Sequence, residues 1–314
     1  MKVGALARRM MTLNLSRTSV TAELKALKKR VVELDAAMAK CRGDLGDLGE
    51  LVAAQRGERS EVSRSLSYVR ALKFERATIP DMTLHPDDDM LDPLHPSARE
   101  HYLDVGLGAL DLIKGALRDK DPRTILDMPC GFGRVTRHLR SAYPDAAIYA
   151  CELEERKIEF CARQFGAIPV LSKVDVDKVV FDVNFDLIWC GSLLTHLDEP
   201  RFRAMLKLIG ESLAPSGLAL VTLQGRFAST FNRHVASYIA NDRFLSIEAQ
   251  CEREGFGYAD YAEGVPYGIA VSSPSFVMRC IEPDRTVTIG GFHERAWDRH
   301  QDVLVLKKEP IDEF

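Results

Sequence analysis

The segment ILDMPCGFGRV, residues 125–135, gives the strongest indication of the fold. Its first residues have the apolar character of a buried strand that ends near Asp127, and a turn containing Gly131 and Gly133 then opens a helix. This arrangement brings backbone N–H groups and a helix N-terminus close to a ligand, and glycine is needed because any Cβ would block the close approach. A Gly-x-Gly turn can also be a plain tight turn, so the neighbouring sequence has to decide its role.

An acidic residue ends the next predicted strand. This residue is Glu152, and a carboxylate in its position can accept hydrogen bonds from both hydroxyls of a ribose. A dinucleotide fingerprint carries a third small residue after the glycines, where this chain has Thr136. The pattern therefore predicts an adenosine-type cofactor site and disfavours a dinucleotide.

Strands and helices alternate around and after this turn. Strands are predicted at 125–128, 147–152, 168–172, 185–191, 217–223, 267–273 and 303–308, and helices at 134–142, 154–165 and 199–213. The alternation predicts an α/β fold, a Rossmann-like parallel sheet with helices on both faces. We expect the last two strands to pair as its antiparallel edge. Residues 226–266 are rich in polar and aromatic side chains and are either a lid-like insertion over the site or a solvated helical insertion.

Apolar residues near the N-terminus follow a heptad pattern. From residue 20 to residue 52 they step by four and three positions in turn, which is the a/d spacing of a coiled coil. The g and e′ positions pair opposite charges, Glu23 with Lys28 and Arg30 with Asp35. We therefore predict a helical coiled-coil arm over residues 1–76. Its heptads at 20–52 either join copies of the chain into a homo-oligomer, which the paired charges favour, or dock on the parent domain.

The segment after the arm has the composition of a linker. Residues 77–96 contain four prolines and five aspartates, which disfavour a continuous helix and apolar burial. Helical spacing resumes at about residue 97. The chain is thus divided into an arm, a linker at 77–96 and a catalytic domain at 97–314.

Composition excludes several other classes of protein. With 46% hydrophobic and 28% charged residues, the chain of 314 residues is an ordinary globular protein, neither fibrous nor wholly disordered. A net charge of −4 argues against general nucleic-acid binding. Seven scattered cysteines without a C-x-x-C pair indicate reduced thiols and a cytoplasmic location. No transmembrane span is predicted, and the basic N-terminus is compatible with peripheral membrane contact or with a frayed end.

Over roughly residues 97–308 the sequence resembles the class I S-adenosylmethionine-dependent methyltransferases. It is most similar to a bacterial group with five ordered motifs, of the types LDxPCGxGRV (126–135), FCAxxFGA-PVxS (160–172), GSLLTHL (191–197), YGxxxSSP (267–274) and W-x-x-HQDV (297–303). Pro129 departs from the class pattern, because a glycine usually stands there. The resemblance implies S-adenosylmethionine as cofactor.

The resemblance also implies roles for individual residues. Asp127 would orient the amino group of the cofactor, Gly131 and Gly133 would admit its methionine portion, and Glu152 would hold its ribose. Around the adenine and the sulfonium, the implied residues are Leu153 beside the adenine ring, Ser172 or Asp175 at the adenine edge, and Gly191 with Ser192 beside the sulfonium.

An alcohol acceptor benefits from a base, and histidines near the sheet edge are the candidates. His196 follows the fourth strand, where it is either a base or a loop or capping histidine. His300 and Asp302 alternate at the start of the last strand, either as a base with its orienting carboxylate or as hydrogen-bonding groups that close the sheet. His293 and Trp297 have the spacing of a short helix. The histidines match no local metal signature, so no metal is predicted.

We expect a methyltransferase that acts on oxygen of a small polar or carbohydrate-containing (glycan) acceptor. Two other hypotheses stay open. In one, the arm carries the function of a non-catalytic assembly protein whose α/β domain is a relic. In the other, the protein is a nicotinamide-dependent oxidoreductase, which Thr136 disfavours.

Overall fold

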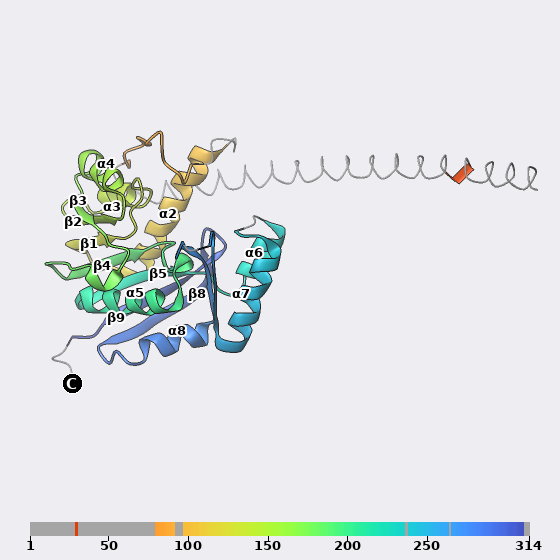
Figure 1. Ribbon diagram of the computed structural model, residues 1–314. Helices are drawn as coiled ribbons and strands as arrows, with labels where there is room; N and C mark the ends of the chain where they lie inside the picture. Colours follow the sequence, from red (N-terminus) through yellow and green to blue (C-terminus); the bar gives the residue numbers. More distant parts are fainter. Residues whose placement is uncertain (1–28, 31–78, 92–96, 236–237, 264, 311–314) are drawn as a thin grey trace, which may run out of the picture. The chain divides into compact units, whose positions relative to one another are not determined.

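The computed structural model describes residues 29–30, 79–91, 97–235, 238–263 and 265–310 (Figure 1). The chain divides into two compact units, Met1–Glu75 and Arg76–Phe314. In the first unit only Lys29 and Arg30 are described, and both are helical, so the predicted arm and its heptads lie outside the described residues. In the described parts, no helix is long and apolar enough to cross a membrane.

A seven-stranded sheet forms the centre of the second unit (Figure 1). Its strands in spatial order are β3 (Ile168–Leu171), β2 (Ala147–Glu152), β1 (Thr124–Asp127), β4 (Phe185–Cys190), β5 (Leu213–Leu223), β9 (Gln301–Lys308) and β8 (Val287–Trp297). The first five are parallel, whereas β9 runs antiparallel to both of its neighbours. This arrangement confirms the predicted Rossmann-like α/β fold.

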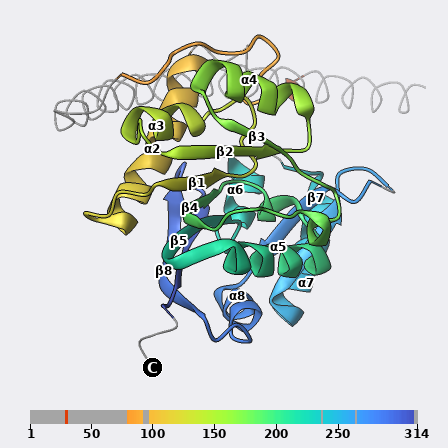
Figure 2. The ribbon, with the colours of Figure 1, turned by 90° about the vertical axis from the view of Figure 1, so that its left-hand side faces the viewer.

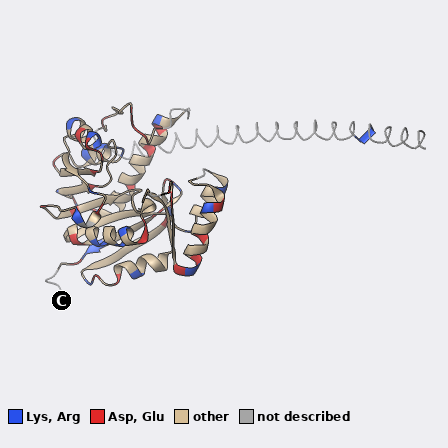
Figure 3. Ribbon diagram, in the orientation of Figure 1, with Lys and Arg blue, Asp and Glu red and all other residues tan. Residues whose placement is uncertain are grey.

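Helices cover the sheet on both faces (Figures 1 and 2). Near the N-terminal half of the sheet these are α2 (Ala98–Leu117), α3 (Thr136–Ala142) and α4 (Glu155–Phe165), and the other layer contains α5 (Glu199–Ser212) and α8 (Pro274–Ile281). Charged residues gather on helices and loops, whereas the strands are mostly free of them (Figure 3). Such strands are expected where both faces of a sheet are buried.

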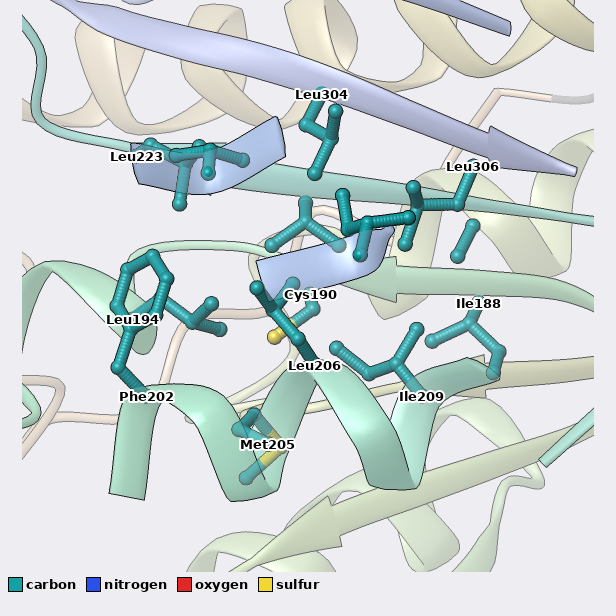
Figure 4. Close-up of a cluster of buried hydrophobic side chains, with 14 of the residues drawn as sticks. Ile188, Cys190, Leu194, Phe202, Met205, Leu206, Ile209, Leu223, Leu304 and Leu306 are labelled. Atoms are coloured by element: carbon teal, nitrogen blue, oxygen red, sulfur yellow. The ribbon is translucent and has the colours of Figure 1, made fainter. Parts of the chain in front are cut away.

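The face of the sheet under α5 and α8 carries a large hydrophobic core cluster. Asp198 caps α5 by accepting a hydrogen bond from the Arg201 backbone N–H (3.1 Å), and the spacing of the apolar residues after this cap places them on one side of the helix. Figure 4 shows the residues that meet there, Phe202, Met205, Leu206 and Ile209 from α5 with Ile188, Cys190, Leu304 and Leu306 from the strands.

The insertion after β5 forms a small module of its own. It contains α6 (Ala228–His234), α7 (Asn241–Glu254) and β6 (Phe256–Asp260), and β6 pairs in antiparallel fashion with β7 (Gly268–Ser272). Ile239, Phe244 and Ile247 are among the residues of its separate core.

Two predictions about the sheet edge are wrong. Strand 267–273 does not join the main sheet, because its residues form β7 and pair with β6 instead. The edge position belongs to β8, which carries His293 and Trp297 on an extended strand and not on a helix. Only the two ends of β8 are buried, so it lacks the apolar alternation that marks a half-buried strand.

Residues 79–91 pack on the domain, which corrects the linker prediction. The buried Arg137 guanidinium donates a hydrogen bond to the backbone carbonyl of Thr83 (2.9 Å). The His85 ring stacks on Phe132 of the glycine turn at 4.2 Å between ring centroids. We call residues 79–91 the strap.

Candidate active site

The candidate site lies where the strand order of the sheet reverses. The sequence order of neighbouring strands decreases from β3 to β1 and increases from β4 to β9. Ligands of open α/β sheets bind outside the carboxyl ends of the strands at such a point. The glycine turn is anchored there by backbone hydrogen bonds on both sides. Met128 N–H donates to the carbonyl of Trp189 (3.0 Å), and Cys130 N–H donates to that of Cys151 (3.0 Å).

Asp127 ends β1 with a carboxylate that is 1% exposed. One oxygen, Oδ2, accepts a hydrogen bond from the Thr136 hydroxyl (2.6 Å), whereas Oδ1 has no partner in the described residues. Burial raises the pKa of Asp127 to about 7. The unpartnered oxygen fits a ligand that supplies a hydrogen-bond donor or a positive charge at this strand end.

The two glycines of the turn have different surroundings. Gly131 has a φ of +52°, and a Cβ added to it would meet no heavy atom within 4 Å, so the backbone there is open to a ligand. Gly133 has a φ of +78°, and a Cβ on it would lie 2.3 Å from a ring carbon of Phe165. Gly131 therefore offers a cradle to a cofactor, whereas Gly133 lets α4 pack closely against the turn.

Glu152, at the end of β2, faces the turn. Its Oε2 accepts a hydrogen bond from Gly131 N–H (3.3 Å), and its Oε1 accepts one from Leu153 N–H (2.7 Å). Leu153 itself is 51% exposed although it is apolar. A carboxylate and an exposed apolar side chain thus stand beside the open backbone of Gly131, as a ribose and an adenine ring require.

The two residues predicted at the adenine edge lie in different surroundings. Ser172 directly follows β3, and its N–H donates to the backbone carbonyl of Glu152 (2.8 Å). Asp175 is exposed and forms an ion pair with Lys178 (2.6 Å). Ser172 is therefore hydrogen-bonded to a residue of the site, whereas Asp175 forms an exposed ion pair with a residue three positions along the chain.

Gly191 and Ser192 follow β4 in a strained turn. A Cβ on Gly191 would come within 2.6 Å of the Trp189 indole nitrogen, and Ser192 has a φ of +59°. Ser192 N–H donates to the Thr222 hydroxyl (2.7 Å), and Ser192 Oγ accepts a hydrogen bond from the Gln301 amide (3.0 Å). Since the Thr222 hydroxyl in turn donates to Gln301 Oε1 (2.6 Å), three strands hold this turn in place.

His196 lies in a short 3₁₀ helix, Leu194–His196, among tyrosines. Its Nδ1 is 2.8 Å from the Gly268 carbonyl oxygen and 3.1 Å from the Tyr261 hydroxyl, and its ring stacks on Tyr267 at 4.8 Å. Because a carbonyl oxygen only accepts, Nδ1 carries the proton and Nε2 keeps its lone pair. Burial lowers the pKa of His196, so the ring is neutral at pH 7.

His300 and Asp302 do not form the predicted pair. His300 precedes β9, its Nδ1 donates to the carbonyl of Asp298 (2.8 Å), and its ring stacks on Phe231 at 4.4 Å. Asp302 Oδ1 accepts a hydrogen bond from Arg295 N–H (2.8 Å). The strand alternation begins only at residue 301, so it does not place the two side chains together.

Sequence reasoning missed Gln301 and Tyr267. Both stand inside quoted motifs, at 297–303 and 267–274, so the motifs themselves were the available signal. In the described part of the chain, no group of three or more His, Cys, Asp or Glu side chains is arranged to hold a metal ion.

The comparisons with known proteins agree with this geometry. Residues 125–217 match the family model described as a methyltransferase domain. The match extends from β1 into β5, so the sheet order and the match together support a methyltransferase domain of Rossmann-like α/β fold.

Two curated relatives carry the name malonyl-[acyl-carrier protein] O-methyltransferase. The protein from Halalkalibacterium halodurans is 26% identical over 149 residues, which cover 46% of this chain and 53% of the relative. The protein from Hahella chejuensis is 25% identical over 148 residues, which cover 44% of this chain and 53% of the relative. The chain therefore spans about half the length of the curated relatives it matches.

The solved structures that the chain matches include methyltransferases. A S-adenosylmethionine-dependent methyltransferase from Clostridium acetobutylicum is 13% identical with a TM-score of 0.46, and the match covers 67% of this chain and 92% of the other. The plantazolicin methyltransferase BpumL is 14% identical with a TM-score of 0.48, and the match covers 68% of this chain and 87% of the other.

Proposed function

We propose that this protein is a S-adenosylmethionine-dependent methyltransferase that methylates oxygen of a small polar or carbohydrate-containing acceptor. The observation that carries the proposal is the buried, unpartnered oxygen of Asp127 beside the open backbone of Gly131. A buried polar atom without a partner destabilises the free protein, so it is expected where a ligand completes the hydrogen bonding.

The cofactor roles follow from position at the sheet edge. Asp127 receives the amino group of the cofactor, Gly131 admits its methionine portion, and Glu152 accepts hydrogen bonds from its ribose. Leu153 packs on the adenine with Ser172 at its edge, and the turn at Gly191 and Ser192 borders the sulfonium. When bound, S-adenosylmethionine supplies an electrophilic methyl group, and the protein then contributes mainly by positioning the acceptor.

His196 is the proposed base. An alcohol acceptor loses its proton as the methyl group is transferred, and the Nε2 lone pair of a neutral His196 accepts that proton. The Gly268 carbonyl and the Tyr267 ring fix the orientation of the imidazole. The relatives are named O-methyltransferases, which supports oxygen as the methylated atom.

Calorimetric titration with S-adenosylhomocysteine and with NAD tests the proposal. We expect the first ligand to bind and the second not to bind, and we expect labelled methyl groups from S-adenosylmethionine to enter the small-molecule or polysaccharide fraction of a cell extract. Binding of NAD alone would support the oxidoreductase hypothesis, and binding of neither ligand would support the relic hypothesis.

We also propose that the protein is a cytoplasmic homo-oligomer joined through residues 20–52. The heptad spacing and the paired charges in that segment support self-association, and scattered cysteines support a reducing compartment.

A further inference from the structure

A closed ring of hydrogen bonds joins three strands at the sheet edge. Ser192 lies just after β4, Thr222 lies in β5, and Gln301 begins β9. Because the Ser192 backbone N–H can only donate, the Thr222 hydroxyl accepts from it (2.7 Å) and gives its own proton to Gln301 Oε1 (2.6 Å). The Gln301 amide nitrogen then faces Ser192 Oγ and donates to it (3.0 Å). The orientation of the Gln301 amide is therefore fixed. We call these three residues the hydrogen-bonded ring.

Ser192 is the member of the hydrogen-bonded ring that can reach a ligand. Thr222 is 0% exposed and Gln301 is 6% exposed, whereas Ser192 is half-buried. Its backbone N–H is used by Thr222, but its Oγ accepts only one hydrogen bond within the described residues. A hydroxyl oxygen has two lone pairs, so one of them remains for a ligand. Gln301 can therefore act on a ligand only through Ser192.

Aromatic packing holds Gln301 and the turn after β4 in the same relative position. Trp297, the partner of Gln301 across β8 and β9, is buried and meets Trp189 edge-on at 5.3 Å. Trp297 Nε1–H also donates to the Val105 carbonyl (3.0 Å). The Trp189 ring packs so closely on Gly191 that an added Cβ would lie 2.6 Å from its nitrogen. The hydrogen-bonded ring is thus built on a rigid aromatic support.

The backbone is strained on both sides of the hydrogen-bonded ring. Between β8 and β9, the φ angles are +57° at Arg295, +47° at Asp298 and +61° at Arg299. On the other side, Ser192 has a φ of +59°. Residues other than glycine adopt such angles only where surrounding contacts enforce them, and they cluster at functional sites. The strain therefore indicates that the placement of Ser192 and Gln301 serves a function.

We propose that Gln301 is a positioning residue that holds the Ser192 hydroxyl oxygen toward the sulfonium of the bound cofactor. The inference rests on the proposed function, which puts the turn at Gly191 and Ser192 beside the sulfonium. An oxygen lone pair attracts the positive sulfonium of S-adenosylmethionine, whereas the sulfur of S-adenosylhomocysteine is neutral. The hydrogen-bonded ring therefore favours binding of the cofactor over binding of the product.

Calorimetric titration of the full chain with each ligand, without an acceptor, tests the inference. Gln301→Met keeps the length of the side chain but removes both of its hydrogen bonds. We expect it to weaken binding of S-adenosylmethionine by about threefold to tenfold, the effect of one lost hydrogen bond, and to change that of S-adenosylhomocysteine by less than about twofold. A purely structural role of Gln301 would weaken binding of both ligands equally.

A double-mutant cycle tests whether Gln301 acts through Ser192. Ser192→Ala should weaken binding of S-adenosylmethionine as much as Gln301→Met does, and the double variant should show no further loss, because the two residues act as one unit. Ser192→Ala retains the backbone hydrogen bond to Thr222, so the comparison of the two ligands can still be made in this variant if Gln301→Met does not fold.

Gln250→Met is the matched control. It makes the same change at a glutamine of the insertion, whose Oε1 accepts a hydrogen bond from Tyr258 N–H (3.2 Å). Its affinity for both ligands should be that of the unmodified protein.

Three results would overturn the inference. They are equal weakening of both ligands in Gln301→Met or in Ser192→Ala, additive losses in the double variant, and a selective loss of S-adenosylmethionine binding in Gln250→Met. In each of these cases the proposed function stands, because the unmodified protein still binds both ligands. If the unmodified protein binds neither ligand, the proposed function is contradicted and the inference fails with it.

Discussion

At the scale of single residues, Asp127 couples the stability of the free protein to pH. Burial raises its pKa from 3.8 to about 7, so the folded state favours the protonated carboxyl. The resulting stability is fully present below the unfolded value of 3.8 and is lost as the pH rises through about 7. Asp127→Asn stays neutral and removes this dependence. Relative to the unmodified protein, the free energy of unfolding of the variant should increase by on the order of a few kcal/mol between pH 4 and pH 8, as measured from melting curves.

The same substitution should weaken binding of S-adenosylhomocysteine by about tenfold or more, since hydrogen bonds between charged groups contribute about 1.5–3 kcal/mol. Asp145→Asn, the same change at an exposed residue, is the control and should alter neither quantity. If the melting temperatures of Asp127→Asn and of the unmodified protein change equally with pH across this range, the account of the buried carboxyl is contradicted.

His196 provides a second prediction at this scale. His196→Asn keeps an N–H for the Gly268 carbonyl but loses the lone pair of Nε2, so the fold and the affinity for S-adenosylhomocysteine should persist. The initial rate of labelled methyl transfer should fall by about 10²–10⁴. In the unmodified protein the rate should decrease as the pH is lowered through the pKa of His196, which burial places below its usual 6.5. His293→Asn, at an exposed histidine, is the control. A His196→Asn variant as active as this control would exclude His196 as the base.

The positions of single residues were predictable where they depended only on which predicted strand the residue follows. Asp127 and Glu152 each end a recognisable strand, and Gly131 lies in the turn after the first. Because parallel strands end at one edge, their proximity follows from the topology. The pairing of His300 with Asp302 depended on where a strand begins, and an error of one residue there removes it. Gln301 was not predictable, because its role rests on hydrogen bonds with Ser192 and Thr222 that only the folded structure reveals.

At the scale of elements, the strap packs on the glycine turn. His85 stacks on Phe132 at 4.2 Å and meets Phe160 edge-on at 5.1 Å. His85→Ala should lower stability by about 1 kcal/mol, as expected for the loss of aromatic pairs, and should weaken binding of S-adenosylhomocysteine because Phe132 lies within the turn. Melting temperature and calorimetry measure the two effects. His101→Ala, at a histidine with a side chain 60% exposed, should leave both nearly unchanged. Equal effects of the two variants would show that the strap does not support the turn.

The elements that escaped prediction share a physical cause. Proline and aspartate in the strap indicate a lack of regular structure, but they do not reveal that Arg137 binds its backbone carbonyls. The edge strand β8 is exposed along most of its length, so no hydrophobic pattern marks it. The parallel strands β1, β4 and β5 were predictable for the opposite reason, since burial on both faces makes most of their residues apolar.

At the scale of the whole molecule, the described domain and the heptad segment follow different patterns of the same sequence. The domain alternates strands with helices, whereas residues 20–52 repeat every seven positions without glycine or proline until Gly43. The strand-helix pattern of the domain does not explain the seven-residue repeat. The apolar a and d positions of the heptads therefore need another surface, and a second copy of the same segment offers one with matching spacing and opposite charges.

This argument predicts that the oligomer depends on the a and d positions alone. Replacing Leu27 and Leu34, both at d, by aspartate buries charge in the seam and should convert the oligomer into a monomer in light scattering. Ala26→Asp with Ala36→Asp introduces the same charges at positions c and f, outside the seam, and should leave the mass unchanged. Affinity for S-adenosylhomocysteine should be equal in both double variants, because the cofactor residues all lie in the second unit. A monomeric unmodified protein, or dissociation in both variants, would show that residues 20–52 do not join copies of the chain as a coiled coil.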